Sequence, residues 1–163
     1  MMKPEELKKC IRDIPNFPQE GIIFKDISTL LKNKKAFKNS IDLLARKFKK
    51  AKIEYVVGVE SRGFIFGAPL AYVLGAGFVP VRKKGKLPYK TKSITYELEY
   101  GKDTLEIHED ALRPNSRVLV VDDLLATGGT IRAVIDLLKG FKAKIVGVTF
   151  LVELKFLQGK DKL

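Results

Sequence analysis

The chain has 163 residues, 45% of them apolar and 31% charged, proportions that are ordinary for a globular protein with a sizeable core. Its apolar runs stay well below the roughly 20 residues of a membrane span, and its polar start lacks the apolar stretch of a signal peptide. Cys10 is the only cysteine, which excludes an intramolecular disulfide and a cysteine metal cluster. We therefore expect a single cytoplasmic domain that does not bind a membrane.

The formal net charge of +12 permits nucleic-acid binding. The basic residues are spread along the expected helices and the tail, however, and no basic run is interleaved with aromatic residues. The sequence also carries no helix-turn-helix or RNA-binding signature. We therefore expect no nucleic-acid partner, and interpret the charge as a solvated surface whose field attracts a polyanionic small molecule.

The first third of the chain contains two segments with helical spacing of apolar residues, 4–14 and 34–50. Prolines at 15 and 18 end the first of these helices. Residues 17–27 between them form an irregular segment rich in turn formers. Its apolar side chains must pack on the core or on a flat ligand.

The rest of the chain alternates strands with helices. Strands are expected at 55–59, 78–82, 118–121 and 145–152, and helices at 64–74 and 131–139. Pro69 is expected in or near the first turns of its helix. The polar stretch 83–110 contains two hairpin arms, 93–98 and 105–107, and a connection of this length is often a lid. The alternation predicts an α/β fold with a mainly parallel sheet flanked by helices.

The most informative segment begins where the apolar strand 118–121 meets Asp122 and Asp123. Because an unpaired aspartate is almost never fully buried, the pair is expected to mark where the strand leaves the core. Ala-Thr-Gly-Gly-Thr follows at 126–130, and such small residues let successive N–H groups at a helix N-terminus cradle a phosphate. The pattern favours a sugar phosphate with a divalent cation nearby, although similar turns without any ligand are common in α/β proteins.

Two further strands also end in polar loops, Glu-Ser-Arg-Gly at 60–63 and Arg-Lys-Lys-Gly at 82–85. In parallel sheets, ligands bind outside the carboxyl ends of the strands. The three loops should therefore converge on one edge of the sheet, which strengthens the prediction of a phosphate site.

Five features in order resemble the type I phosphoribosyltransferases, most closely the adenine-specific branch, over almost the whole chain. They are the acidic pair and its loop at 122–130, Phe-Pro-x-x-Gly-Ile-x-Phe-x-Asp-Ile at 17–27, Glu-Ser-Arg-Gly-Phe at 60–64, the two loop motifs at 82–88 and 96–101, and Val-Glu-Leu at 152–154. The resemblance implies the type I phosphoribosyltransferase fold, with a small N-terminal hood (1–30) and a flexible catalytic loop (83–110) in a single domain of residues 1–163. It also implies a homodimer.

The activity implied by the resemblance is transfer of a phosphoribosyl group from 5-phospho-α-D-ribose 1-diphosphate (PRPP) to N9 of adenine, which yields AMP and diphosphate. The cofactor would be Mg²⁺, held through substrate and water near Asp122 and Asp123 rather than by direct protein ligands. The two carboxylates would bind the ribose hydroxyls and stabilise the ribosyl cation as the leaving group departs.

The resemblance also assigns the remaining site residues. The 5′-phosphate would be bound by Ala126, Thr127, Gly128, Gly129 and Thr130. The diphosphate would be bound by Ser61, Arg62, Arg82 and Lys86, with Arg62 also catalytic and the Glu60–Ser61 peptide cis. The adenine would be bound by Ile23, Phe24, Lys25 and Leu154, stacked between Phe24 and Leu154. The catalytic residue that handles the N9 proton would be Glu99.

Four residues need a separate comment. Without the resemblance, Glu99 would be taken as a solvated hairpin carboxylate. Lys25 stands where many relatives carry arginine, which preserves the charge but alters hydrogen-bond geometry. His108 is expected at the surface, and Cys10 as a small core residue.

Two alternative functions stay open. The first is a phosphoribosyltransferase for another purine, such as xanthine, hypoxanthine or guanine. The second is a PRPP-sensing regulator that binds nucleic acid, for which the net charge of +12 is the main support.

Overall fold

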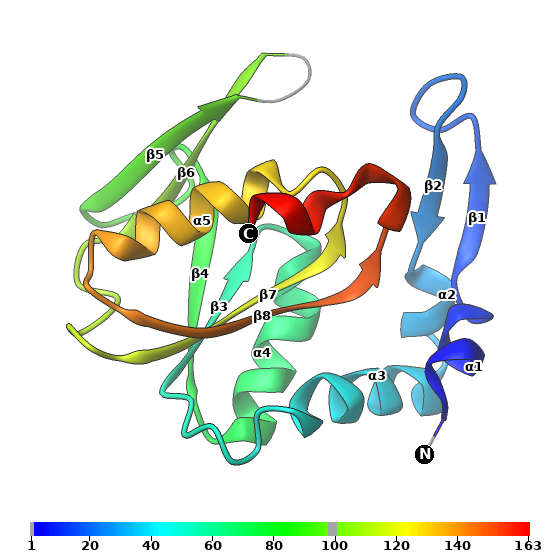
Figure 1. Ribbon diagram of the computed structural model, residues 1–163, viewed down its shortest axis with the longest axis horizontal. Helices are drawn as coiled ribbons and strands as arrows, with labels where there is room; N and C mark the ends of the chain where they lie inside the picture. The colour runs from blue at the N-terminus through cyan, green and yellow to red at the C-terminus, as the bar shows by residue number, and fades with distance from the viewer. Residues whose placement is uncertain (1, 98–100) are drawn as a thin grey trace. The chain divides into compact units, whose positions relative to one another are not determined.

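The computed structural model describes residues 2–97 and 101–163 (Figure 1). The chain divides into two compact units, Met1–Leu43 and Leu44–Leu163. The first unit carries the segment expected to form the hood, and the second carries the three strand-end loops.

The first unit contains a short two-stranded sheet. Its elements are α1 (Pro4–Lys8), β1 (Arg12–Pro15), β2 (Ile23–Asp26), α2 (Ser28–Leu31) and most of α3 (Lys34–Arg46). The predicted helix over 4–14 is wrong beyond Lys8, and the predicted irregular segment 17–27 contains β2. The antiparallel pairing explains both corrections, because Lys25 Nζ lies 2.7 Å from Asp13 Oδ2 and Arg12 also pairs with Asp26 across the strands.

The helix predicted at 34–50 is present as α3, which ends at Arg46. Asn33 Oδ1 accepts hydrogen bonds from the backbone N–H groups of Lys35 and Ala36, both at 3.1 Å, and so caps its first turn. Its apolar face buries Ala36, Ile41 and Ala45.

The second unit is built on a six-stranded sheet of order β5-β6-β4-β3-β7-β8 (Figure 1). The strands are β3 (Tyr55–Val59), β4 (Gly77–Lys83), β5 (Thr91–Glu97), β6 (Lys102–His108), β7 (Arg117–Leu125) and β8 (Lys144–Glu153). The helices are α4 (Arg62–Leu74) and α5 (Gly129–Lys139), followed by the 3-10 helices η1 (Lys155–Leu157) and η2 (Gly159–Lys162). Strands β3, β4, β7 and β8 are parallel, and β5 and β6 pair antiparallel, which confirms the predicted mainly parallel α/β sheet and its hairpin.

Successive side chains along a strand point to opposite faces of the sheet, so a strand that is buried on both faces needs cover on each side. Here a different helix covers each face. Val57 and Val120 belong to the cluster that includes the apolar face of α5. Their neighbour Val121 faces α4, where a side chain at Gly67 would lie 3.1 Å from its Cγ1. The end of β7 and the starts of both helices therefore come together at the carboxyl edge of the sheet.

One detail of α4 differs from expectation. Pro69 is the eighth of its 13 residues, in the middle of the helix and not in its first turns. The hydrogen bond that proline cannot donate would have gone to the carbonyl of Ile65, whose side chain is on the exposed side of the helix. In the part of the chain that the structure describes, no helix combines the length and the apolar character that a membrane crossing requires.

Candidate active site

The three polar strand-end loops converge at the carboxyl edge of the second unit's sheet, as predicted. Arg62 Nε lies 2.9 Å from Asp123 Oδ2, which joins the loop after β3 to the end of β7. Arg82 Nη2 lies 3.1 Å from Glu60 Oε1, which joins the loop after β3 to the end of β4. The edge therefore brings cationic and anionic groups from three strands into one cluster.

The acidic pair does not lie where β7 leaves the core. The strand continues through both aspartates to Leu125 and pairs with β8 over its whole length, with Asp122 opposite Phe150. Asp123 is only 5% exposed, and its burial is compatible with its charge because Arg62 is its partner. The alternation of side chains along β7 explains this partner. Asp123 points to the same face of the sheet as Val121, and α4 covers that face. Arg62 is the first residue of α4.

Burial raises the pKa of both carboxyls, but the charged neighbours of the two groups act in opposite directions. For Asp122, burial and the negative charge of Asp123 raise the pKa to about 8. For Asp123, burial also raises the pKa, but the Arg62 guanidinium opposes this rise. Asp123 is thus the carboxyl that forms an ion pair with Arg62, whereas Asp122 is the carboxyl whose pKa is raised by its neighbour Asp123.

Gly63 permits this close approach of α4 to β7. A Cβ atom at Gly63 would lie 2.9 Å from Asp122 Oδ1 and 3.2 Å from the carbonyl oxygen of Val121. The glycine of the Glu-Ser-Arg-Gly loop is therefore required by packing against the acidic pair. The Glu60–Ser61 peptide is cis, as expected.

The loop at 126–130, which we call the phosphate loop, joins β7 to α5. Gly128 has φ +82°, a conformation that favours glycine, and α5 starts at Gly129. The first N–H groups of a helix have no partners within the helix, so they are available to a ligand. Thr130 Oγ1 lies 3.4 Å from the Tyr96 hydroxyl, a contact between the loop and β5 that sequence reasoning missed.

The predicted diphosphate residues differ in their surroundings. Arg62 is paired with Asp123, and the side chain of Arg82 bonds both to Glu60 and to the carbonyl of Lys86, at 2.9 Å. Burial alone would raise the pKa of Glu60, but hydrogen bonds from Arg82 and from the Lys83 amide lower it. Ser61 and Lys86 are exposed beside this network. Glu60 consequently balances the charge of Arg82, a pairing that no local sequence signal indicated.

The stem of the expected lid packs on the second unit. Ile94 and Tyr96 of β5 lie against the core cluster, and Lys92 Nζ stands 4.2 Å from the centre of the Phe141 ring. Lys83 Nζ lies 3.1 Å from Asp103 Oδ2, which ties the start of this segment to β6. Glu99 lies outside the described residues, so its role stays a prediction.

The predicted adenine residues belong to different units. Ile23, Phe24 and Lys25 lie on β2, where Phe24 makes an edge contact with Phe17, with ring centres 5.2 Å apart. Lys25 pairs with Asp13, so its charge is already balanced. Leu154 follows β8 in the second unit and donates its backbone N–H to the carbonyl of Leu125 at 2.9 Å. Stacking of a base between Phe24 and Leu154 stays a prediction.

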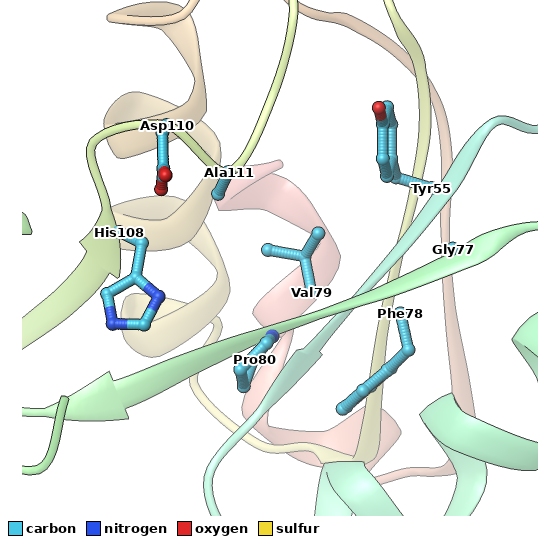
Figure 2. A pocket seen from close by; sticks show the side chains of 8 residues that line it. All are labelled: Tyr55, Gly77, Phe78, Val79, Pro80, His108, Asp110 and Ala111. Carbon is cyan, nitrogen blue, oxygen red and sulfur yellow. The ribbon is translucent and has the colours of Figure 1, made fainter. Parts of the chain in front are cut away.

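A cavity of about 270 Å³ lies beside the amino ends of β3 and β4, and Figure 2 shows the side chains that line it. Its lining includes Tyr55 and Gly77, the first residues of β3 and β4. His108 also lines it; the residue is partly buried and its Nε2 is inaccessible to solvent, so it lies at the surface only in part. Tyr89 packs against the imidazole with ring centres 6.0 Å apart, a contact that the charge-rich sequence around His108 did not indicate.

Cys10 is partly buried rather than part of the core, and its Sγ lies 3.5 Å from the carbonyl of Glu6. Among the described residues, no group of three or more His, Cys, Asp or Glu side chains could hold a metal ion. The adjacent carboxylates Asp122 and Asp123 do fit a hydrated Mg²⁺ carried by substrate, because this cation prefers oxygen ligands and retains several waters.

Comparison with known proteins shows the family of the chain. The phosphoribosyl transferase domain model matches residues 26–161. Adenine phosphoribosyltransferase of Syntrophotalea carbinolica is 58% identical over 98% of this chain and 93% of its own length. The crystal structure of adenine phosphoribosyltransferase from Thermoanaerobacter pseudethanolicus matches with a TM-score of 0.95 and 54% identity, covering 98% of this chain and 93% of that one.

The enzyme from Saccharomyces cerevisiae, solved with adenine and an imino-altritol bisphosphate, matches with a TM-score of 0.94 and 45% identity, over 98% of this chain and 93% of that one. The chain belongs to the phosphoribosyl transferase family and, within it, to the adenine phosphoribosyltransferases.

Proposed function

We propose that this protein catalyses the reaction of adenine with PRPP to give AMP and diphosphate. The observation that carries the proposal is the position of the acidic pair, which is joined to Arg62 by an ion pair and followed in the chain by the phosphate loop at the start of α5. PRPP carries a phosphate and a diphosphate on either side of two ribose hydroxyls. These groups match the features gathered at this edge of the sheet.

In the proposed reaction, N9 of adenine forms a bond to C1′ of PRPP while the bond from C1′ to the diphosphate oxygen breaks. The diphosphate leaves with the bonding electrons, so positive charge develops on the ribosyl group. Asp122 and Asp123 accept hydrogen bonds from the ribose hydroxyls, and their negative charge stabilises that cation. Backbone N–H groups and threonine hydroxyls at 126–130 hold the 5′-phosphate.

The leaving diphosphate is bound by Ser61 and Arg62, and by Arg82 once PRPP competes with Glu60 for its guanidinium. Lys86 adds a further positive charge from the start of the segment 83–110. Mg²⁺, when bound, offsets the charge of the diphosphate through oxygen contacts and water near Asp122 and Asp123.

The acceptor base is held by Ile23, Phe24, Lys25 and Leu154, with the ring between Phe24 and Leu154. Glu99 takes the N9 proton as the new bond forms. The segment 83–110 acts as a lid that excludes water and so protects PRPP from hydrolysis. This proposal predicts that Glu99→Gln slows AMP formation while leaving the affinity for ribose 5-phosphate unchanged.

We also propose that the protein is a cytoplasmic homodimer. Helix α4 is apolar on all sides and leaves Ile65, Tyr72 and Val73 at 37%, 88% and 42% exposure. An apolar helix face of this kind is typical of an interface. Sedimentation of the wild type should give a dimer, and Tyr72→Arg should shift it toward the monomer.

The test of the proposed function is the rate of nucleotide formation by the purified protein with PRPP, Mg²⁺ and each of four bases. Adenine should be the preferred acceptor over hypoxanthine, guanine and xanthine. A preference for any oxo-purine, or the absence of nucleotide formation, would contradict the proposal.

A further inference from the structure

Gly159 is the one buried residue in the otherwise exposed stretch 155–163. Neighbouring side chains face solvent, including that of Phe156, which is 78% exposed. Burial of a glycine in such a segment means that its backbone itself is packed against another part of the protein.

The partner of Gly159 is the phosphate loop. A Cβ atom at Gly159 would collide with the carbonyl oxygen of Ala126 and would lie 3.1 Å from the backbone nitrogen of Gly128. Conversely, a Cβ atom at Gly128 would collide with the carbonyl oxygen of Gly159. The two backbones touch where neither residue has room for a side chain, and the obstructing atoms are backbone atoms that cannot rotate away.

The segment is anchored to both elements that flank the loop. Lys160 Nζ lies 2.8 Å from Glu153 Oε2 at the end of β8, which pairs with β7 before the loop. Arg132 Nη1, in α5 after the loop, lies 3.5 Å from the carbonyl oxygen of Lys162. These contacts hold Gly159 in place against the loop.

We propose that Gly159 is a positioning residue that fixes the phosphate loop in the shape that binds the 5′-phosphate, an inference that rests on the proposed function. It acts through Ala126 and Gly128 and does not itself touch substrate. A side chain at 159 pushes the loop carbonyl aside and tilts the adjoining N–H donors away from the phosphate.

The test is calorimetric titration of wild type and Gly159→Ala with two probes, ribose 5-phosphate and inorganic diphosphate with Mg²⁺. Ribose 5-phosphate contains the group that the loop binds, whereas diphosphate reports on the separate site around Arg62. We expect Gly159→Ala to weaken ribose 5-phosphate binding about tenfold or more, as a displacement of around 1 Å can, with little change for diphosphate. The KM for PRPP should rise more than kcat falls.

Gly140→Ala is the matched control, because Gly140 directly follows α5 with an ordinary φ of −62° and lies at the opposite end of that helix from the loop. It should leave both affinities unchanged. Equal ribose 5-phosphate affinity in wild type and Gly159→Ala, or an equal loss for both probes, would overturn the proposal.

If Gly159→Ala does not fold, Lys160→Ala tests the same anchoring through its pair with Glu153, with Lys155→Ala as a charge-matched control. Weaker ribose 5-phosphate binding in Lys160→Ala alone supports the proposal, and identical binding in the two variants overturns it. Failure of the proposed function is distinguishable, because a wild type that binds ribose 5-phosphate but makes no AMP contradicts only the reaction.

Discussion

Arg62 at the start of α4 and Asp123 near the end of β7 form an ion pair with 2.9 Å between Nε and Oδ2. The pair links the candidate diphosphate loop to the candidate hydroxyl-binding carboxylates. Asp123 is nearly buried, while a third of the Arg62 side chain is accessible. The arginine can therefore contact both the carboxylate and an incoming anion.

We expect Asp123→Asn to lower turnover far more than it lowers thermal stability. The amide keeps the shape of the side chain but loses the charge that stabilises a ribosyl cation, so kcat should fall by about 100-fold. The accessible part of Arg62 lets water compensate for the lost pair, which limits the fall in Tm. Unfolding without a specific loss of activity in the folded fraction would mean that the pair is structural.

The raised pKa of Asp122 makes the stability of the protein depend on pH. The folded protein retains a proton on Asp122 up to about pH 8, whereas the unfolded chain loses it around the ordinary value of 3.8. Because the unfolded state then binds fewer protons, this group's contribution to stability is full below pH 3.8 and decreases as pH rises toward 8.

Asp122→Asn removes this titration. The Tm of the variant relative to wild type should therefore increase from pH 5 to pH 8, as measured by thermal unfolding without ligands. A Tm difference that does not change with pH would show that Asp122 has no raised pKa in the folded protein.

Gly63→Ala should disturb the acidic pair directly. The added methyl group would lie 2.9 Å from Asp122 Oδ1 and 3.2 Å from a backbone carbonyl, so the start of α4 must shift away from β7. We expect kcat/KM to fall by about tenfold or more, since small displacements of binding groups are costly.

The control for this variant is Gly77→Ala, whose nearest neighbour is the Tyr55 ring at 3.1 Å. A side chain can adjust, so activity should be nearly normal there. Equal activity in the two variants would show that the spacing between α4 and β7 is not critical.

Two variants distinguish binding of the 5′-phosphate by the Thr130 hydroxyl from its contact with the Tyr96 hydroxyl. If Thr130 binds the 5′-phosphate, Thr130→Val should raise the KM for PRPP by about tenfold, the range of one hydrogen bond to a charged group. Tyr96→Phe removes only the 3.4 Å contact to the hydroxyl and should have a small effect. Similar KM values for the two variants would assign the hydroxyl to the hairpin contact instead.

The sequence predicted the second unit well because its signals are local. Apolar runs rich in β-branched residues identify β3 and β7 as strands covered on both faces, and helical spacing identifies α5. The N-terminal region was predicted less well, since Leu7, Ile11 and Ile14 suit a helix as well as a helix followed by a strand. Pairing of β1 with β2 joins residues from two separate segments, such as Arg12 with Asp26, which a local pattern does not contain.

In the candidate site, too, features that follow from local sequence were predicted and contacts between distant residues were not. The convergence of loops follows from parallel topology and was predicted, and so was the cis Glu60–Ser61 peptide. The pairing of Arg82 with Glu60 and the packing of Gly159 on the phosphate loop were not, because both join residues distant in sequence. The burial of Asp123 was missed for a related reason: its compensating partner, Arg62, comes from another element.

A crystal structure of the protein with AMP and inorganic diphosphate tests the central assignment most directly. The AMP phosphate should lie against the backbone N–H groups of 126–130, with the ribose hydroxyls within hydrogen-bond distance of Asp122 and Asp123 and the diphosphate beside Arg62. An AMP phosphate bound away from 126–130, or ribose hydroxyls that do not face the acidic pair, would contradict it.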